Sequence, residues 1–204
     1  MVHVPPLYGV ILAGGASRRM QVDKAALSYG GRPQLQRAYE LVSSRCERTF
    51  VSVRGDQRGE STRAAFAQIE DLHPGLGPIA GIIAAFTQHP EVAWLVVACD
   101  LPFLSAATLD QLIRQRDPER MASAFRSSYD ELPEPLCAIW EPKSFPSLQR
   151  WMAAGKQCPR KFLIDGDVAL LQQPEAKALD NVNTPDEYRN AASQLQSATP
   201  QRAQ

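Results

Sequence analysis

The chain has 204 residues, of which 44% are hydrophobic and 22% are charged, with 22 basic residues balanced by 22 acidic ones. This composition argues against a disordered chain, because the apolar side chains are numerous enough to build a core. A net charge of zero argues against nonspecific binding to nucleic acid or to a membrane surface, since both need a positive field. The sequence also has no apolar run of about 18 residues and no signal-type N-terminus, so we expect a cytoplasmic protein.

Apolar runs predict the strands of one sheet, with helices between them. The strands are expected at 7–12, 49–53, 93–99, 121–125 and 135–140. Because these runs show little polar alternation, they suit strands that are covered on both faces, as in a parallel α/β sheet. The helices are expected at 34–45, 59–67, 78–88 and 105–116. The last of these has Ser105 as its expected N-cap. The alternation of strand and helix predicts right-handed β-α-β units.

The regular alternation of expected strands and helices ends near residue 126, and prolines cluster between residues 117 and 159. We interpret about 121–180 as a less regular lobe attached to the sheet, within a single domain that spans 1–192. The polar stretch 193–204 is expected to be a disordered tail. The four cysteines include no C-x-x-C pair, so we expect buried free thiols rather than a zinc or redox site.

A loop of small residues follows the first expected strand, in the sequence ILAGGASRRMQVDKAAL at 11–27. Its small residues have almost no side-chain bulk, so the backbone N–H groups can approach an anion closely. Arg18, Arg19 and Lys24 follow, and three cations beside such a loop indicate a polyphosphate ligand. The Walker pattern and the dinucleotide-binding fingerprint are both absent, which disfavours the proteins that carry them.

An acidic residue follows another expected strand, in AWLVVACDLPFLS at 93–105. Open α/β sheets bind their ligands outside the carboxyl ends of the strands. Asp100 directly follows such a strand, so its carboxylate is well placed to hold Mg²⁺ beside a phosphate loop. The alternative is a turn-forming Asp before a proline.

Two further segments lead into expected helices. In DLHPGLGPIAGI, at 71–82, glycines precede a helix that opens at Pro78, a position that suits proline. In ALDNVNTPDEY, at 178–188, a Thr and a Glu three residues apart form a capping box, which predicts a helix start. Asn181 and Asn183 lie just before that start. Their amides can orient a ligand, or they are ordinary turn residues.

Taken together, these four segments resemble the molybdenum cofactor guanylyltransferase family, whose first signature reads L-A-G-G-x-S-x-R-M-G-x-D-K. The chain also resembles the family in its D-x-x-P-G-x-G-P-x-A-G, C-D-x-P and N-x-N-T-P motifs, which follow the first signature in the expected order. It departs at Gln21, where the family usually has Gly, and at Arg54, near a place where the family tends to have Asn. For that reason no family contact is carried over to Arg54.

The resemblance implies a Rossmann-like, three-layer α/β sandwich of the nucleotidyltransferase type, with a mostly parallel central sheet. It implies transfer of GMP from GTP to the terminal phosphate of molybdopterin or molybdenum cofactor, with release of pyrophosphate. Mg²⁺ is the implied cofactor and Asp100 its ligand. Cofactor-delivery proteins are expected as transient partners, and neither nucleic acid nor a membrane is expected. The implied residues are catalytic Arg18, Arg19, Lys24 and Asp100; nucleotide-binding Leu12, Ala13, Gly14, Gly15, Ser17, Lys24, Asp71, Gly77 and Asp100; and acceptor-binding Asn181 and Asn183.

Three alternatives stay open. One is a related enzyme that transfers CMP to the same acceptor, although such relatives typically read L-A-A-G where this chain reads LAGG. Another is a sugar-phosphate nucleotidyltransferase, which usually has a longer and more basic loop. The third is a nucleotide-binding accessory protein without turnover, which the presence of Lys24 and Asp100 disfavours. In the poorly matching region 126–175, the loop SSYDELPEP and the cations Arg160 and Lys161 are either acceptor contacts or solvated surface.

Overall fold

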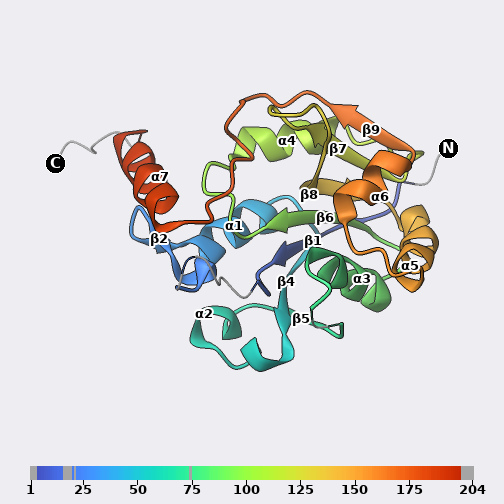
Figure 1. Ribbon diagram of the computed structural model, residues 1–204, viewed down its shortest axis with the longest axis horizontal. Helices are drawn as coiled ribbons and strands as arrows, with labels where there is room; N and C mark the ends of the chain where they lie inside the picture. The colour runs from blue at the N-terminus through green and yellow to red at the C-terminus, as the bar shows by residue number, and fades with distance from the viewer. Residues whose placement is uncertain (1–3, 16–19, 21, 74, 199–204) are drawn as a thin grey trace.

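The structure is a computed structural model that describes residues 4–15, 20, 22–73 and 75–198 (Figure 1). One sheet runs through this part of the chain, and its strands are β1 (Leu7–Leu12), β4 (Arg48–Arg54), β5 (Gln68–Asp71), β6 (Ala93–Ala98), β7 (Ala122–Arg126), β8 (Pro133–Trp140) and β9 (Val168–Leu171). In space they follow the order β5-β4-β1-β6-β8-β7-β9. Among the described strands of this sheet, β8 alone runs antiparallel to the others, so the sheet is mostly parallel, as predicted.

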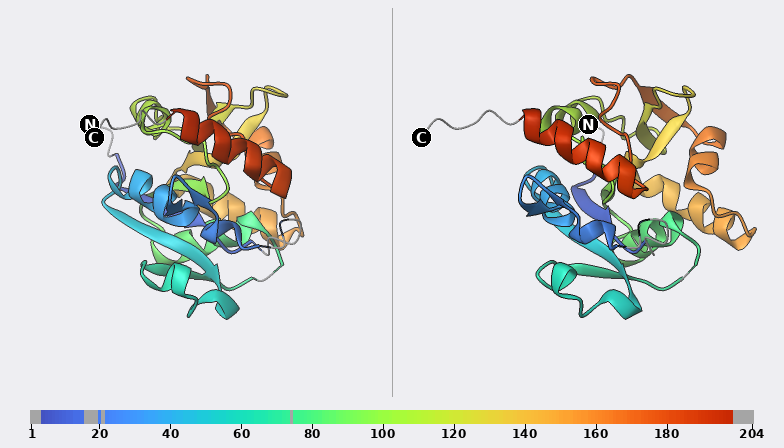
Figure 2. Two further views of the ribbon diagram at one scale, coloured as in Figure 1. Left: turned by 90° about the vertical axis from the view of Figure 1, so that its left-hand side faces the viewer. Right: turned by 60° about the vertical axis from the view of Figure 1, so that its left-hand side comes forward.

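Helices lie on both faces of the sheet and produce three layers (Figures 1 and 2). The α-helices described are α1 (Gln34–Ser43), α2 (Ser61–Ala64), α3 (Pro78–Gln88), α4 (Ala106–Arg114), α5 (Phe145–Ala153), α6 (Pro159–Asp165) and α7 (Pro185–Ala198). α1 and α4 pack on one face, whereas α3, α5 and α6 pack on the other. The predicted Rossmann-like three-layer α/β sandwich is therefore confirmed.

The central strand β6 shows why the layers form. Its Leu95 and Val97 belong to the core beneath α1 and α4, whereas Trp94 and Val96 belong to the core beneath α3 and α5. All four side chains are fully buried. Successive side chains of a strand point to opposite faces, so a strand that is apolar throughout fills two cores at once.

The strands predicted from apolar runs are confirmed as β1, β4, β6, β7 and β8. The helices that form α1, α3 and α4 are also confirmed, and the Ser105 hydroxyl caps α4 by accepting the N–H of Thr108. The helix predicted at 59–67 is wrong in extent, because only the short α2 forms there and β5 follows it. The sequence does not predict β5, since this edge strand buries a single apolar side chain, Ile69.

The segment from β7 to β9 extends the same sheet beyond β6. Its helices α5 and α6 lie between β8 and β9. The sequence predicts a less regular lobe here, without the positions of α5, α6 and β9. The residues of β9 are all at least partly exposed, and α6 is a short helix that opens at Pro159, so neither carries the pattern of a fully buried element.

The C-terminal helix α7 continues to Ala198, so the disordered tail predicted from residue 193 is wrong as far as 198. The physical reason is an apolar stripe at helical spacing. Ala191 and Leu195 pack with Tyr29, which lies in the two-stranded ribbon of β2 (Ser28–Tyr29) and β3 (Arg32–Pro33). Figures 1 and 2 show α7 beside this ribbon, which explains why the last helix stays attached to the N-terminal part.

The cysteines are free thiols, as predicted. Cys99 and Cys137 are buried and Cys46 is partly buried, but Cys158 is exposed, because it lies at the surface before α6. Across the residues described, no helix combines the length and the apolar character needed to cross a bilayer.

Candidate nucleotide-binding site

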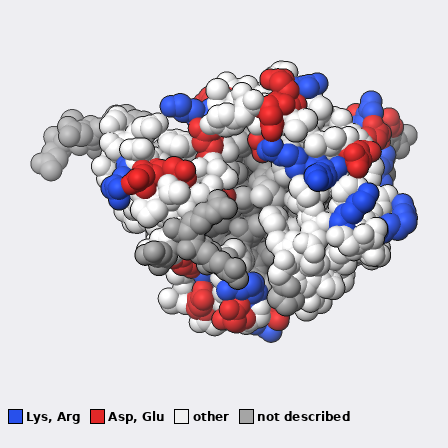
Figure 3. Space-filling model, viewed as in Figure 1, with Lys and Arg blue, Asp and Glu red and all other residues white. Residues whose placement is uncertain are grey.

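A cavity of about 760 Å³ lies at the edge of the sheet where four parallel strands end. The last residue of each strand lines it: Leu12 of β1, Arg54 of β4, Asp71 of β5 and Ala98 of β6. The carboxyl ends of parallel strands are where open α/β sheets bind their ligands. The face of the molecule in Figure 3 is hollowed near its centre, with basic and acidic side chains interspersed around the hollow.

The first turn of α3 borders the cavity through Gly77, Pro78 and Gly81. Gly77 has a φ of 71°, in the left-handed region that favours glycine, and precedes the start of α3 at Pro78. At Gly81 a Cβ would lie 2.8 Å from Leu12 Cδ2, so the helix approaches β1 this closely because glycine stands there. The N-terminus of a helix carries a partial positive charge, which suits a phosphate group.

Lys24, Asp100 and Asn183 converge on this cavity from distant parts of the chain. The ammonium of Lys24 donates to Asp100 Oδ2 at 2.9 Å and to Asn183 Oδ1 at 2.5 Å. The side chains of Lys24 and Asp100 are 18% and 24% exposed, so both remain accessible from the cavity. A cation for phosphates and a carboxylate for a hard metal ion therefore stand side by side.

The segment before α7 is tied to the site by its backbone and its cap. The N–H of Val182 donates to the carbonyl of Asp100 at 3.1 Å. The Glu187 carboxylate accepts the N–H of Asn183 at 2.6 Å and that of Thr184 at 3.2 Å, and the Thr184 hydroxyl accepts the N–H of Glu187. The predicted capping box is thus confirmed. The cap of α7 fixes Asn183 where it meets Lys24.

Asp23 lines the cavity, although the sequence assigns it no role. Its carboxylate caps the short helix η1 (Lys24–Ala26) by accepting the N–H of Ala25 at 3.1 Å. Burial acts to raise the pKa of Asp23, but its hydrogen bonds and the charge of Arg63 bring that pKa below its ordinary value. Asp23 is therefore ionised beside the cavity at neutral pH. An Asp directly before a short helix is the signal that predicts such a cap.

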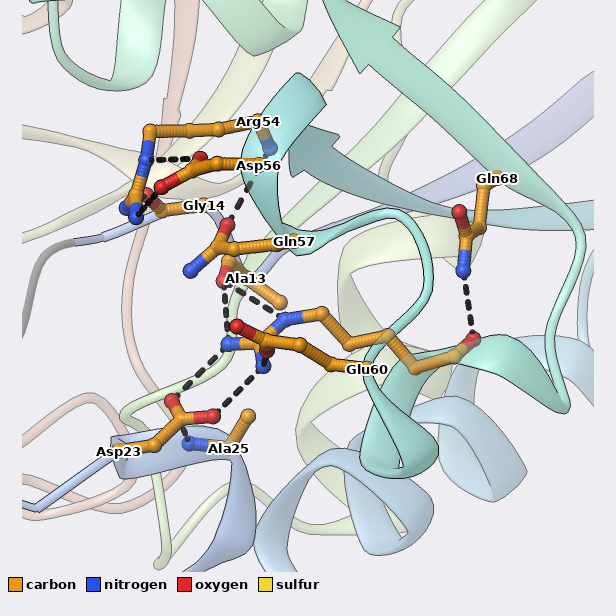
Figure 4. Close-up of polar contacts among 10 residues, drawn as sticks. Ala13, Gly14, Asp23, Ala25, Arg54, Asp56, Gln57, Glu60 and Gln68 are labelled. Carbon is orange, nitrogen blue, oxygen red and sulfur yellow. Dashed lines mark hydrogen bonds and ion pairs between the residues drawn. The ribbon is translucent and has the colours of Figure 1, made fainter.

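Arg54 also lines the cavity, at the end of β4. Its Nη1 donates to the carbonyl of Gly14, while Nε and Nη2 donate to the Asp56 carboxylate at 3.0 Å each (Figure 4). The guanidinium thus connects the end of β4 to the loop that follows β1. The sequence signal for Arg54 is its place at the end of a strand parallel to β1, which brings it to the same edge of the sheet.

A second cavity, of about 220 Å³, adjoins the first. Ala98, Asp100 and Leu136 line both cavities, so the Asp100 carboxylate stands where they meet. The smaller cavity also contains Asn181 and Arg160. Of the two asparagines of the N-x-N motif, Asn183 therefore lines the larger cavity and Asn181 the smaller one.

Arg160 is held by an acidic residue of the β7–β8 connection and by one of β8 itself. It pairs with Asp130 at 2.9 Å and with Glu134 at 2.8 Å, and its side chain is 31% exposed. Lys161, the neighbouring cation, is exposed on α6 and lines neither cavity. Of the two cations, only Arg160 thus stands at a cavity.

No group of three or more His, Cys, Asp and Glu side chains forms a ready-made metal site within the described ranges. Besides Asp23, whose carboxylate is bound by Arg63, the cavity has Asp100 and Asp71 as carboxylates, and Asp71 Oδ1 accepts the N–H of His73 at 2.8 Å. Mg²⁺ is usually bound through one or two carboxylates together with substrate phosphates and water. This donor set fits a magnesium ion that binds with a polyphosphate.

Cys99 is the thiol that borders the cavity. Burial, and then the charge of Asp100, raise the pKa of Cys99 to about 12. A thiol with this pKa is protonated at neutral pH and is a poor nucleophile. Chemistry at this site therefore rests on its charged and amide groups.

The structure brings most of the predicted site residues together. The larger cavity is lined by Leu12, Ala13, Gly14, Gly15, Lys24, Asp71, Gly77, Asp100 and Asn183. Asn181 lines the smaller cavity. Ser17, Arg18 and Arg19, with Gln21, lie outside the described residues.

Comparison with known proteins agrees with this geometry. A profile of the family described as MobA-like NTP transferase domain matches residues 9–173. The molybdenum cofactor biosynthesis bifunctional protein of Synechocystis sp. is 33% identical over 187 residues, which cover 92% of this chain and 54% of that protein. The chain thus spans about half the length of that relative.

Two further relatives match along nearly their whole length. The molybdenum cofactor guanylyltransferase of Cereibacter sphaeroides is 28% identical over 193 residues, which cover 93% of this chain and 97% of that protein. The crystal structure of molybdopterin-guanine dinucleotide biosynthesis protein A from Archaeoglobus fulgidus has a TM-score of 0.77 at 26% identity. That comparison covers 93% of this chain and 99% of the other.

Proposed function

Because the chain belongs to the MobA-like NTP transferase domain family, we propose that it transfers GMP from GTP to the terminal phosphate of molybdopterin or molybdenum cofactor. Pyrophosphate is the second product. The observation that carries this proposal is the meeting of Lys24, Asp100 and Asn183 where a large and a small cavity adjoin. The relatives named molybdenum cofactor guanylyltransferase supply the identity of the nucleotide and of the acceptor.

The larger cavity is the proposed nucleotide site. It combines a loop of small residues, the N-terminus of α3 and the Lys24 ammonium, which together suit a triphosphate. Leu12, Asp71 and Gly77 are the proposed contacts to the rest of the nucleotide. Ser17, Arg18 and Arg19 remain expected phosphate contacts that lie outside the described residues.

The smaller cavity is the proposed acceptor side. It lies against Asp100 and contains the amide of Asn181 and the guanidinium of Arg160. An amide offers both donors and an acceptor, as a pterin needs, and a guanidinium suits a phosphate. In this proposal the two substrates approach Asp100 from opposite cavities, with Asn183 beside the reacting phosphates.

The chemistry needs no protein nucleophile. A phosphate monoester has a second pKa of about 6, so the acceptor is mostly dianionic at neutral pH. One of its oxygens forms a bond to the α-phosphorus of GTP, and the bond from that phosphorus to the bridging oxygen of pyrophosphate breaks. Lys24 offsets charge that develops on the phosphates. When bound to Asp100, Mg²⁺ supplies the charge that links the two anionic substrates.

The test is release of pyrophosphate by the purified protein with Mg²⁺ and molybdopterin, with GTP, CTP, ATP and UTP in parallel reactions. We expect pyrophosphate to be released with GTP and not with CTP, ATP or UTP, and only when the acceptor is present. A preference for CTP would replace the guanylyltransferase proposal with a cytidylyltransferase. Release with a sugar phosphate in place of molybdopterin would identify a different acceptor class. If the protein binds GTP but releases no pyrophosphate in any of these reactions, it is an accessory protein.

Two further expectations accompany this proposal. The product is a modified cofactor that other enzymes use, so we propose transient contact with cofactor-delivery proteins. The cytoplasmic location expected from the sequence stays a prediction.

A further inference from the structure

Arg63 of α2 is fully buried, although it is charged and stands in one of the shortest helices described. Its guanidinium lies behind the nucleotide cavity, where it contacts the two described ends of the loop that follows β1. Nε and Nη2 donate to the carbonyl of Ala13, at 3.3 Å and 2.9 Å. Nη1 and Nη2 donate to the two carboxylate oxygens of Asp23, at 2.6 Å and 2.9 Å.

The remaining N–H of Nη1 donates to the Glu60 carboxylate. All five N–H groups of the guanidinium therefore have an acceptor. The dashed lines at Ala13 and Asp23 in Figure 4 show the contacts with the loop. The main chain of Arg63 is also held, because its carbonyl accepts the side-chain amide of Gln68 at 2.9 Å. A buried guanidinium fixed at every donor is rigid, and lysine cannot reproduce its planar fork.

Each partner of Arg63 in the loop is connected to the proposed chemistry. Ala13 and Asp23 both line the cavity. Asp23 caps the helix that begins with Lys24, and the Lys24 ammonium reaches Asp100 and Asn183. The chain of contacts thus runs from Arg63 through Asp23 and Lys24 to Asp100.

Arg63 also shields charge. An ionised Asp23 at the wall of a site for a triphosphate would repel that ligand. Both oxygens of this carboxylate are instead bound to Arg63, which is opposite in charge. The same contact therefore fixes the loop and offsets an unfavourable charge.

We propose that Arg63 is a positioning residue for the transfer reaction, which holds Ala13 and Asp23 at a fixed separation and thereby places Lys24 at the phosphates. The expected loss of kcat/KM rests on the proposed function, whereas the expected change in the position of Lys24 does not. Without Arg63, the protein is expected to fold and to lose the alignment of Lys24.

The test compares Arg63→Gln with a matched control, Arg116→Gln. Arg116 is a largely buried arginine with a side chain 9% exposed, which donates to Glu141 at 2.6 and 2.9 Å and to the carbonyl of Pro5, away from both cavities. Arg63→Gln should lower kcat/KM for GTP by about 10- to 100-fold, as expected when a reacting group is misplaced. Arg116→Gln should lower stability and leave kcat/KM near that of wild type. Equal kinetic effects of the two substitutions would overturn the proposal.

A second measurement does not depend on the reaction. Each folded variant is treated with an amine-reactive reagent, and labelling of Lys24 is compared with that of Lys177 by peptide mass mapping. Faster labelling of Lys24 in Arg63→Gln than in Arg116→Gln is the expected result. Unchanged labelling would overturn the inference even if the wild-type protein transfers GMP. Absence of transfer by the wild-type protein would contradict the proposed function alone.

Asp23→Asn supplies an independent variant if Arg63→Gln does not fold. It keeps the size of the side chain and removes the charge that Arg63 offsets. In that case Asp23→Asn alone should lower kcat/KM for GTP and speed the labelling of Lys24 relative to Arg116→Gln, and no change in either would overturn the proposal. Where both single variants fold, the loss of kcat/KM in the double variant should be smaller than the product of the single losses, because both residues act through the same contact. Fully multiplicative losses would show that Arg63 does not act through Asp23, which contradicts the proposal.

Discussion

The two cavities meet at Asp100, but they are built in different ways. The larger one is formed by the ends of parallel strands, by loops that directly follow them and by the first turn of α3. The smaller one is formed by β8, α6 and the segment before α7, and its cation Arg160 is already paired with Asp130 and Glu134. We infer that the strand ends preorganise the nucleotide side, and that each substrate competes with an internal ion pair, GTP with Lys24–Asp100 and the acceptor with those of Arg160.

The strongest test of this comparison is a substitution of Asp100, the charged residue among the three that line both cavities. Asp100→Asn keeps the shape of the side chain and an oxygen that accepts from Lys24, but it removes the charge needed for a metal ion. Transfer should fall by about 10²- to 10³-fold, while the protein remains folded and binds nucleotide. The rate of pyrophosphate release checks this result. Asp110→Asn, which alters a surface carboxylate paired with Arg45, is the control, and an equal effect of both changes would refute the assignment.

A substitution in the smaller cavity separates the two sides. Arg160→Gln should raise KM for the acceptor by about tenfold and leave KM for GTP unchanged, because only one substrate loses a contact. Initial rates at varied concentrations of each substrate give the two constants. Arg150→Gln on α5 is the matched surface control. A change in KM for GTP instead would place Arg160 on the nucleotide side and contradict the proposed assignment of one cavity to each substrate.

A substitution beneath the larger cavity tests how rigid that side is. In Gly81→Ala the added Cβ would lie 2.6 Å from Ser52 Oγ and 2.8 Å from Leu12 Cδ2. We expect the free energy of unfolding to fall by about 1–3 kcal/mol and the affinity for GTP to fall with it. Denaturant unfolding and GTP titration measure both. Gly59→Ala, where a Cβ meets open space, is the control and should be neutral.

The smallest expected effect concerns acid stability at the loop of the nucleotide side. The pKa of Asp23 is lowered from 3.8 in the folded protein. Ionised Asp23 therefore stabilises the fold above pH 3.8, and this contribution is lost as the pH falls through the lower folded value. The stability difference between the wild type and Asp23→Asn should shrink below about pH 4. A difference that stays constant from neutral to acidic pH would contradict the Arg63–Asp23 contact.

The same contrast explains what the sequence predicts. The nucleotide side depends on apolar strands and on residues next to them in sequence, so Lys24, Asp71 and Asp100 are recognisable from local patterns. Arg63 is not recognisable, because its partners in the loop after β1 lie 40 and 50 residues away and nothing near it in sequence marks a buried charge. Arg54 is found only once the register of β4 against β1 is known.

The acceptor side depends on contacts that no local pattern reports. β9 is a partly exposed edge strand, and α6 begins at a proline after irregular sequence. Arg160 meets its partner Asp130 across 30 positions of the chain. The tail predicted from residue 193 is a helix as far as 198, because Leu195 packs with residues of the N-terminal part.

The most direct test of the central claim follows the phosphorus atoms of GTP during the reaction. Two samples are prepared, one labelled at the α-phosphorus and one at the γ-phosphorus, and each is incubated with the protein, Mg²⁺ and molybdopterin. If GMP is transferred at Asp100, the α-label appears in the dinucleotide product and the γ-label appears in pyrophosphate. Transfer of the γ-label to the acceptor would instead reveal a kinase-type reaction and contradict this account.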